Sequence, residues 1–291
     1  MRLAILSRSR TLYSTRRLAE AGRRRRHDVR IIDPNRCTIS TADGELATTR
    51  DGLPLDAFDW LIPRVGGGSS SWGLALLRHL ELQQVRVLNS SFGAMVASDK
   101  LRTLQELTAA GVAVPSTLQT KNPEELAALV AHVGGPPVIL KLLKGTQGVG
   151  VIKVDTVESA VSTLEAMWSL GEDVLVQEFV AESTGVDRRA LVVDGRVVGA
   201  MERTAREGEF RANVHRGATT RKVDLDDASR DIALRAAAAL DLRIAGVDLL
   251  PSSRGPLVLE VNASPGLEGI EGATGRDIAA DIIKCIERLS S

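Results

Sequence analysis

The sequence predicts an α/β fold that becomes α+β along the chain. Short β-rich runs alternate with amphipathic helical stretches in the first half, as in parallel βα units. Three apolar runs and an intervening helix follow, and two hairpin patterns then indicate antiparallel sheet. The 291 residues allow about two domains. We expect an N-terminal parallel α/β unit over residues 1–97, a small central α+β unit over 98–180 and a C-terminal antiparallel unit over 181–291.

The N-terminal unit contains four predicted strands, at residues 3–6, 29–32, 60–62 and 85–88. Between the last two, Gly73, Leu76, Leu77 and Leu80 recur with helical spacing, which predicts a helix with one buried stripe. We expect the four arginines at 23–26 to close the first helix, because cations favour the negative end of its dipole, with a polyanion-binding role as the alternative.

The central unit begins with a predicted helix over 98–110, with Leu101, Leu104 and Thr108 on one side, which ends at Gly111. Asn122, a proline and two acidic residues then form a strong helix start, and the helix ends at glycines 134 and 135. The apolar runs at 138–143, 149–154 and 174–180 are predicted strands.

The C-terminal unit is predicted to contain two hairpins and a closing helix. Residues 191–198 form a hairpin whose Asp194-Gly195 turn supplies the positive φ of a two-residue loop. Residues 245–250 and 257–261 form the second hairpin. The closing helix has a stripe of isoleucines at 278, 282 and 286.

The composition excludes several classes of protein. The chain has 37 basic and 37 acidic side chains and only eight aromatic residues, which argues against nucleic-acid binding. No apolar run approaches the roughly 20 residues that cross a membrane, so we expect a cytoplasmic protein. Cys37 and Cys285 lie too far from other ligands for a metal site, and we interpret them as structural thiols. No hydrolase or metalloprotease motif occurs.

Lys141 interrupts an apolar run that otherwise predicts a buried strand, and a buried ammonium needs an anion. Only seven of the basic residues are lysines, and Lys100, Lys141 and Lys144 lie near the glycine-rich segment 145–150. Backbone N–H groups of such a segment can close around phosphate. The segment fits neither the P-loop nor the dinucleotide fingerprint. A lysine that reaches water from a strand edge and an ordinary hairpin loop remain alternatives.

Three oxygen-bearing side chains indicate a metal site. Glu260 and Asn262 lie two residues apart on a predicted strand and therefore share a face, and Asp248 lies within the preceding apolar strand. Oxygen donors without Cys or His suit Mg²⁺, which commonly combines one or two carboxylates with substrate phosphates. The alternative is a solvated sheet face.

Arg203, Arg211, Asn213 and Arg216 form a polar stretch whose forked donors suit phosphate or carboxylate oxygens, although a solvated loop is equally consistent with the pattern.

These motifs occur in a recognisable order: DKLR at 99–102, LK at 140–141, GTQGVG at 145–150, VQEFV at 176–180, Asp248, and EVNASPG at 260–266. Together they closely resemble the ATP-grasp ligases, and the resemblance extends over the whole chain. The segments at 3–8, 11–14, 210–217 and 265–271 resemble the RimK branch in particular. Enzymes of that branch add L-glutamate to the C-terminus of small-subunit ribosomal protein six.

The resemblance implies an ATP-grasp fold, ATP as a substrate, two Mg²⁺ ions for which Mn²⁺ can substitute, and a homotetramer or homodimer. Asp248, Glu260 and Asn262 are then metal ligands, and Arg203 and Arg189 are candidates for binding substrate carboxylates. The implied ATP-binding residues are Lys100, Lys141, Gly145, Thr146, Gln147, Gly148, Gly150, Glu178, Phe179, Val180, Asp187, Arg211 and Asn213.

The expected reaction is an ATP-dependent ligation through an acylphosphate, which yields ADP and phosphate. Alternatives are a related ligase that acts on a biosynthetic carrier protein or a cofactor, a nucleotide-binding regulatory module without turnover, and a dinucleotide oxidoreductase. The absent dinucleotide fingerprint argues against the last of these.

Overall fold

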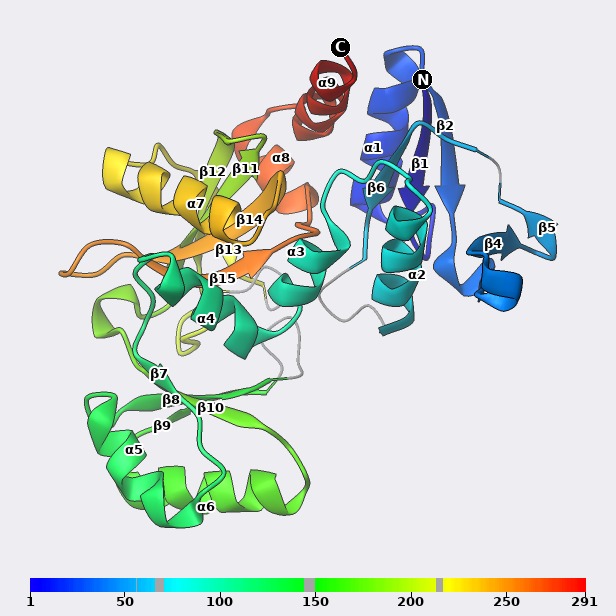
Figure 1. Cartoon of the computed structure of the whole chain (residues 1–291). Helices are drawn as coiled ribbons and strands as arrows, with labels where there is room; N and C mark the ends of the chain where they lie inside the picture. The colour runs from blue at the N-terminus through cyan, green and yellow to red at the C-terminus, as the bar shows by residue number, and fades with distance from the viewer. Residues whose placement is uncertain (56, 66–70, 144–149, 213–216) are drawn as a thin grey trace.

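The computed structural model describes the whole chain except residues 56, 66–70, 144–149 and 213–216. Figure 1 shows the chain passing from an N-terminal α/β unit, through a separate layer of sheet and helices, to a larger sheet covered by helices. The described strands form four sheets. The fold combines parallel and antiparallel sheet, as the sequence predicts.

The N-terminal unit is built on a parallel sheet of order β2-β1-β6. Its strands and helices are β1 (Arg2–Leu6), α1 (Tyr13–Arg24), β2 (Asp28–Ile32), β6 (Trp60–Pro63) and α2 (Ser71–Leu82). The buried stripe of α2 contains the four residues predicted for it.

The prediction of a strand at 85–88 is wrong. Only Val87 forms a bridge, to Leu61 of β6. The chain then turns away because the amide of Asn89 bonds the backbone of Ile244, and Ser90 caps the next helix. A small antiparallel sheet was not predicted; it contains β3 (Cys37–Ser40), β4 (Ala47–Arg50) and β5 (Leu53–Pro54).

Two helices lead into the central unit, α3 (Ser91–Ala97) and α4 (Lys100–Ala109). Asp99 caps α4 through the N–H groups of residues 101 and 102, so this helix begins later than predicted. Its buried face is also different: Thr103, Leu104 and Leu107 are buried, whereas Thr108 is exposed.

The central unit has an antiparallel sheet of order β7-β10-β8-β9 with two helices packed on it. Its own apolar core is separate from the cores of the other units. Its elements are β7 (Thr117–Leu118), α5 (Leu126–His132), β8 (Val138–Leu142), β9 (Val151–Val154), α6 (Val157–Ser169) and β10 (Val174–Glu178).

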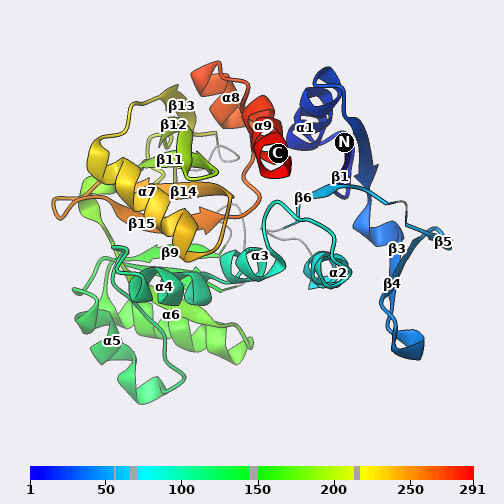
Figure 2. The same cartoon turned by 45° about the horizontal axis from the view of Figure 1, so that its top comes forward.

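The C-terminal unit is a five-stranded antiparallel sheet of order β13-β12-β11-β14-β15. One face packs on α7 and the opposite face on α8 and α9 (Figure 2). Asp194 (φ 51°) and Gly195 (φ 68°) confirm the predicted tight turn. The elements are β11 (Val186–Val193), β12 (Arg196–Thr204), β13 (Thr219–Lys222), α7 (Asp227–Ala239), β14 (Ile244–Leu250), β15 (Leu257–Asn262), α8 (Glu268–Thr274) and α9 (Ile278–Ser290).

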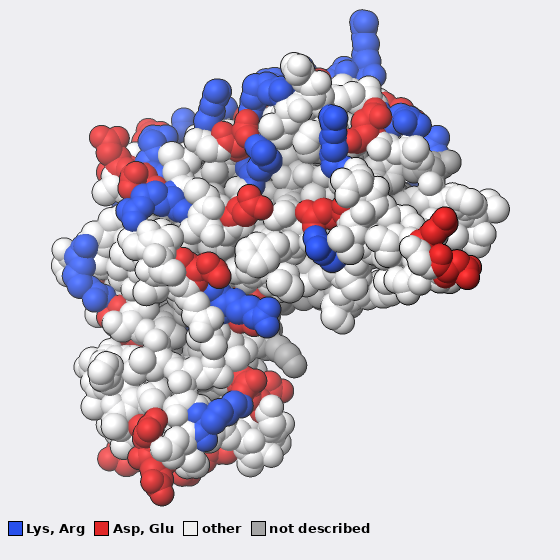
Figure 3. Space-filling view, viewed as in Figure 1, with Lys and Arg blue, Asp and Glu red and all other residues white. Residues whose placement is uncertain are grey.

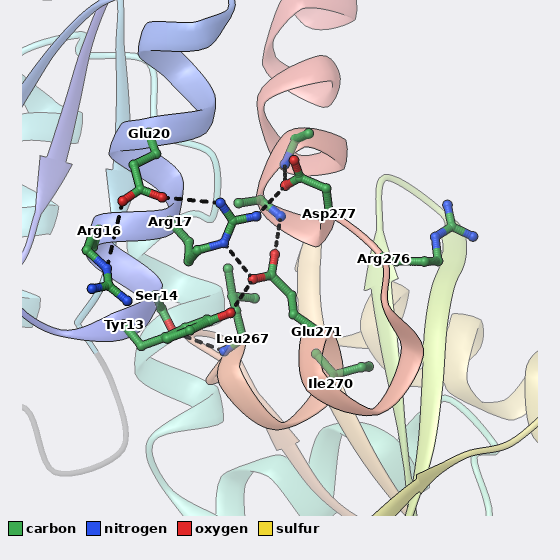
Figure 4. Close-up of polar contacts among 12 residues, drawn as sticks. Tyr13, Ser14, Arg16, Arg17, Glu20, Leu267, Ile270, Glu271, Arg276 and Asp277 are labelled. Carbon is green, nitrogen blue, oxygen red and sulfur yellow. Dashed lines mark hydrogen bonds and ion pairs between the residues drawn. The ribbon is translucent and has the colours of Figure 1, made fainter.

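A polar network centred on the buried Glu271 joins the first helix to the last two (Figure 4). The Glu271 carboxylate of α8 accepts hydrogen bonds from Tyr13 (2.9 Å) and Arg17 (2.8 Å) of α1 and from the N–H of Ala279 in α9 (3.0 Å). Arg17 also donates to Asp277 at 2.8 Å. These bonds hold the N-terminal unit against the C-terminal unit.

Basic and acidic side chains are interspersed on the face shown in Figure 3, in keeping with the zero net charge. Cys37 and Cys285 are buried free thiols, as predicted. None of the helices in the described ranges is long and apolar enough to span a membrane.

Candidate active site

A buried arginine, a half-buried arginine and two buried aspartates pair across the middle strands of the five-stranded sheet. Arg189 of β11 donates from Nε and Nη2 to the two carboxylate oxygens of Asp248 on β14, both at 2.6 Å. Arg203 of β12 donates in the same bidentate manner to Asp187 of β11, at 2.5 and 2.7 Å. Its Nη2 also lies 3.0 Å from Asp248. The two arginines expected to bind substrate therefore pair with the protein's own carboxylates.

Burial and pairing act in opposite directions on these groups. Burial raises the pKa of Asp187 to about 6, although Arg203 opposes the shift. Burial also favours the neutral form of Asp248, but attraction by Arg189 and Arg203 outweighs it and lowers the pKa of Asp248 below its ordinary value. Asp248 is therefore a carboxylate anion at neutral pH.

The other two predicted metal ligands lie on the neighbouring strand. The β14–β15 register pairs Asp248 with Glu260 and Gly246 with Asn262. An irregularity in this register leaves Leu259 without a partner, and such a bulge re-aims the side chains beside it. Val261 is buried and Glu260 is exposed. The predicted side-chain set thus occupies one region of two adjacent strands.

Two lysines approach this region from other elements. Lys100, at the start of α4, donates to the Leu143 carbonyl at 3.2 Å. The pKa of Lys141 on β8 is lowered to about 8, chiefly by burial; Lys100 contributes to the lowering, whereas Glu260 and Asp248 oppose it. The negative charge of Glu260 acts to raise the pKa of both lysines. The structure therefore gathers two cations from different elements near the carboxylates of β14 and β15.

At the end of β10, both the backbone N–H and the carboxylate of Glu178 already have hydrogen-bond partners within the protein. The N–H of Glu178 donates to the Ser116 carbonyl at 2.9 Å, and its carboxylate accepts from Arg254 at 2.6 Å. Phe179 and Val180 follow the strand, and the Phe179 ring lies 5.0 Å from the Lys153 ammonium. An adenine base bound at this segment would therefore have to pair with polar groups other than the Glu178 N–H.

Arg211 and Gly150 complete the predicted residues that the structure describes. Arg211 donates to both carboxylate oxygens of Glu209 at 2.8 Å, and to the Val151 carbonyl at 3.3 Å. Gly150 has a φ of 74°, and a Cβ there would lie 2.6 Å from the Leu142 side chain. The other members of the predicted loop and cluster, Gly145, Thr146, Gln147, Gly148, Asn213 and Arg216, lie outside the described residues.

Asn89 is a positioning residue that sequence reasoning missed. Its side-chain amide donates to the carbonyls of Ile244 (2.8 Å) and Ala263 (2.7 Å) and accepts from the Ile244 N–H (2.9 Å). It therefore joins the start of β14 to the segment that follows Asn262. A lone Asn after a weak strand pattern carries no signal of these bonds.

The donor chemistry fits nucleotide phosphates with a divalent cation. Asp248, Glu260 and Asn262 offer only oxygen donors, which suits Mg²⁺. Among the described residues, no three His, Cys, Asp or Glu side chains are grouped to hold a metal on their own. A cation here would therefore need further oxygen ligands, and phosphates near Lys100 and Lys141 would supply them.

Comparison with known proteins identifies the class. Residues 97–286 match the RimK-like ATP-grasp domain and residues 1–94 the RimK PreATP-grasp domain. The chain adopts an ATP-grasp fold and is an ATP-dependent ligase.

The protein belongs to the RimK family. It is 48% identical over 287 residues to a protein named probable alpha-L-glutamate ligase from Cellvibrio japonicus (strain Ueda107), covering 99% of this chain and 95% of that protein. Identity to probable alpha-L-glutamate ligase 1 of Hahella chejuensis (strain KCTC 2396) is 47%, covering 100% and 96%. Among solved structures, a RimK domain protein ATP-grasp from Sphaerobacter thermophilus DSM 20745 aligns with a TM-score of 0.76 at 24% identity, covering 98% of this chain and 99% of the other.

Proposed function

We propose that this ligase forms an amide bond between L-glutamate and the C-terminal carboxylate of a protein, with small-subunit ribosomal protein six as the acceptor. The observation that carries the proposal is the convergence of Lys100, Lys141, Asp248 and Glu260 in a chain whose relatives are named probable alpha-L-glutamate ligases. Such an acceptor places the reaction in the cytoplasm. We expect a homotetramer or homodimer.

In this proposal Lys100 and Lys141 bind the nucleotide phosphates, with the glycine-rich segment at 145–150 closing over them. The segment from Glu178 to Val180 receives adenine. Asp187 contacts the ribose through lone pairs that remain when it is paired with Arg203. Arg211 and Asn213 complete the nucleotide site.

Asp248, Glu260 and Asn262 would hold two Mg²⁺ ions, with Mn²⁺ able to substitute. When bound, the ions neutralise charge that develops on the phosphates during transfer. Arg189 and Arg203 use Nε and Nη2 to hold Asp248 and Asp187, which leaves Nη1 of each guanidinium as the donor for a substrate carboxylate. We therefore assign them first to positioning those two carboxylates.

The chemistry needs no protein nucleophile. The acceptor carboxylate attacks the γ-phosphorus of ATP, ADP leaves, and an acylphosphate forms. The glutamate amine then attacks the acyl carbon, loses a proton and displaces phosphate. Lys100 and Lys141 stabilise the negative charge on the transferring group, and exclusion of water protects the acylphosphate from hydrolysis.

Intact-mass spectrometry of ribosomal protein six tests the proposal directly. The acceptor is incubated with the enzyme, ATP, Mg²⁺ and L-glutamate, beside a sample without ATP. We expect masses that rise by whole glutamyl residues only when ATP is present. An unchanged acceptor, with ADP released on addition of a carrier protein or another acid, would assign the enzyme to a related ligation.

A regulatory module without turnover is tested by the same reagents. Glu260→Gln removes an exposed carboxylate that has no hydrogen bond or ion pair within the described part of the chain, so it leaves the fold intact. In a ligase this substitution abolishes ADP release. Asp248→Asn is a weaker test, because it also removes the charged partner of Arg189 and of the buried Arg203.

A further inference from the structure

The Arg64 side chain is crowded by protein yet lacks a partner among the described residues. It directly follows β6, and its backbone N–H donates to the Leu6 carbonyl at 2.9 Å. Burial alone lowers the pKa of Arg64 to about 10. Arg189 and Arg203, by comparison, are each bound to a carboxylate. A desolvated cation without a counterion costs free energy, and such groups persist where a ligand supplies the opposite charge.

The topology places this side chain at a ligand-binding position. In the order β2-β1-β6, the chain runs from β1 to β2 on one side and later returns to β6 on the other. This reversal is a topological switch point, and open α/β sheets bind their ligands in the crevice expected there, at the carboxyl ends of the strands, here β1 and β6. Leu6 pairs with Pro63 in the register, so Ser7 and Arg64 border this crevice.

The crevice adjoins the proposed reaction centre. The Ser264 hydroxyl donates to the Pro63 carbonyl at 3.4 Å, and Ser264 lies two residues beyond Asn262 of β15. Val65 packs in the same apolar core as Val261 and Ala263. The carboxyl end of β6 therefore lies against the segment that leaves the proposed metal ligands.

We propose that Arg64 binds a substrate carboxylate in the crevice between the carboxyl ends of β1 and β6. The inference rests on the proposed ligase function: glutamate brings two carboxylates, and a tail that already ends in glutamate carries one besides the reacting group. A planar guanidinium binds a carboxylate through two parallel hydrogen bonds, which fixes its orientation as well as its position.

Steady-state kinetics of Arg64→Gln, Arg64→Lys and the control Arg78→Gln test the assignment. Arg78 lies on α2 of the same unit, is exposed and pairs with Glu81. We expect Arg64→Gln to raise KM for glutamate or for the acceptor by about 10- to 100-fold, the loss typical of hydrogen bonds to a charged group. Arg64→Lys recovers part of the loss, and Arg78→Gln behaves as wild type.

The substrate whose KM rises identifies the source of the carboxylate. If Arg64 binds the side-chain carboxylate of glutamate, Arg64→Gln also reduces the enzyme's preference for L-glutamate over L-glutamine as substrate. The melting temperature without substrates distinguishes a binding role of Arg64 from a structural one. If Arg64 binds substrate, the melting temperature of Arg64→Gln should be unchanged or higher than that of the wild type. A lower melting temperature with both KM values unchanged would overturn the assignment.

The kinetics also separate this inference from the proposed function. If the wild type ligates glutamate and Arg64→Gln matches it in both KM values, the role of Arg64 is refuted while the function stands. If the wild type ligates a different acid or amine and Arg64→Gln raises KM for that substrate, the carboxylate site stands while the glutamate assignment fails.

Discussion

Replacing Lys141 with methionine is expected to stabilise the ligand-free protein and to abolish ligation. The pKa of about 8, against an ordinary 10.5, corresponds to about 3 kcal/mol against the charged form. Part of the side chain still reaches solvent, so we expect a gain of about 1–3 kcal/mol in the free energy of unfolding at pH 7. Methionine keeps the length of the side chain and adapts to the same space.

The pH dependence of this gain has a definite sign. Below pH 8 the lysine is charged in both the folded and unfolded states, and the full destabilisation is present. Between pH 8 and 10.5 the folded state loses the proton first, so the destabilisation fades as pH rises. The stability difference between Lys141→Met and wild type should therefore shrink across this interval.

Urea unfolding at pH 7 and at pH 10 measures the difference, with Lys153→Met as the matched control. Lys153 lies on β9, whose strand pairs with β8, and its ammonium is 2.8 Å from Asp155 and 5.0 Å from the Phe179 ring. Because it has these partners, its loss should destabilise by about 0.5–1 kcal/mol. A Lys141→Met protein that is less stable than wild type at pH 7, or whose difference is independent of pH, would refute the reasoning.

Three further substitutions test the fold and the site. Glu271→Gln should lower the free energy of unfolding by about 2–3 kcal/mol because it weakens three hydrogen bonds to a buried carboxylate. Glu20→Gln on the exposed surface of α1 should change it by less than about 0.5 kcal/mol, and urea unfolding measures both. Glu260→Gln should abolish ADP release with an unchanged melting temperature, and wild-type turnover in this variant would contradict its assignment as a metal ligand. Both Gly150 and Gly134 have positive φ, but of the two only Gly150 would bring a Cβ against another side chain. Gly150→Ala should therefore lower the stability measured by thermal unfolding by about 1–2 kcal/mol more than Gly134→Ala does. Equal losses would contradict the close contact.

Local pattern was sufficient for much of the fold. Short β-rich runs predicted β1, β2 and β6, and such runs with turn residues between them predicted both C-terminal hairpins, because these signals are properties of adjacent residues. The Asp194-Gly195 turn was predicted because few residue pairs accept positive φ at both positions. The prediction of a strand at 85–88 was wrong because local pattern contains no information on distant contacts. These residues resemble a strand, but contacts of Asn89 with distant segments redirect the chain.

The sequence by itself determined the fold class and the types of side chain that the candidate site contains. The tertiary structure alone decided how they pair. Arg189 lies 59 residues from Asp248, and Arg203 lies 16 from Asp187, so neither pair is visible in local spacing. The pairs exist because strand order makes β11 the neighbour of both β12 and β14. Likewise, only the order β2-β1-β6 places Arg64 at the crevice beside the end of β15, because strand order is set by packing between distant segments.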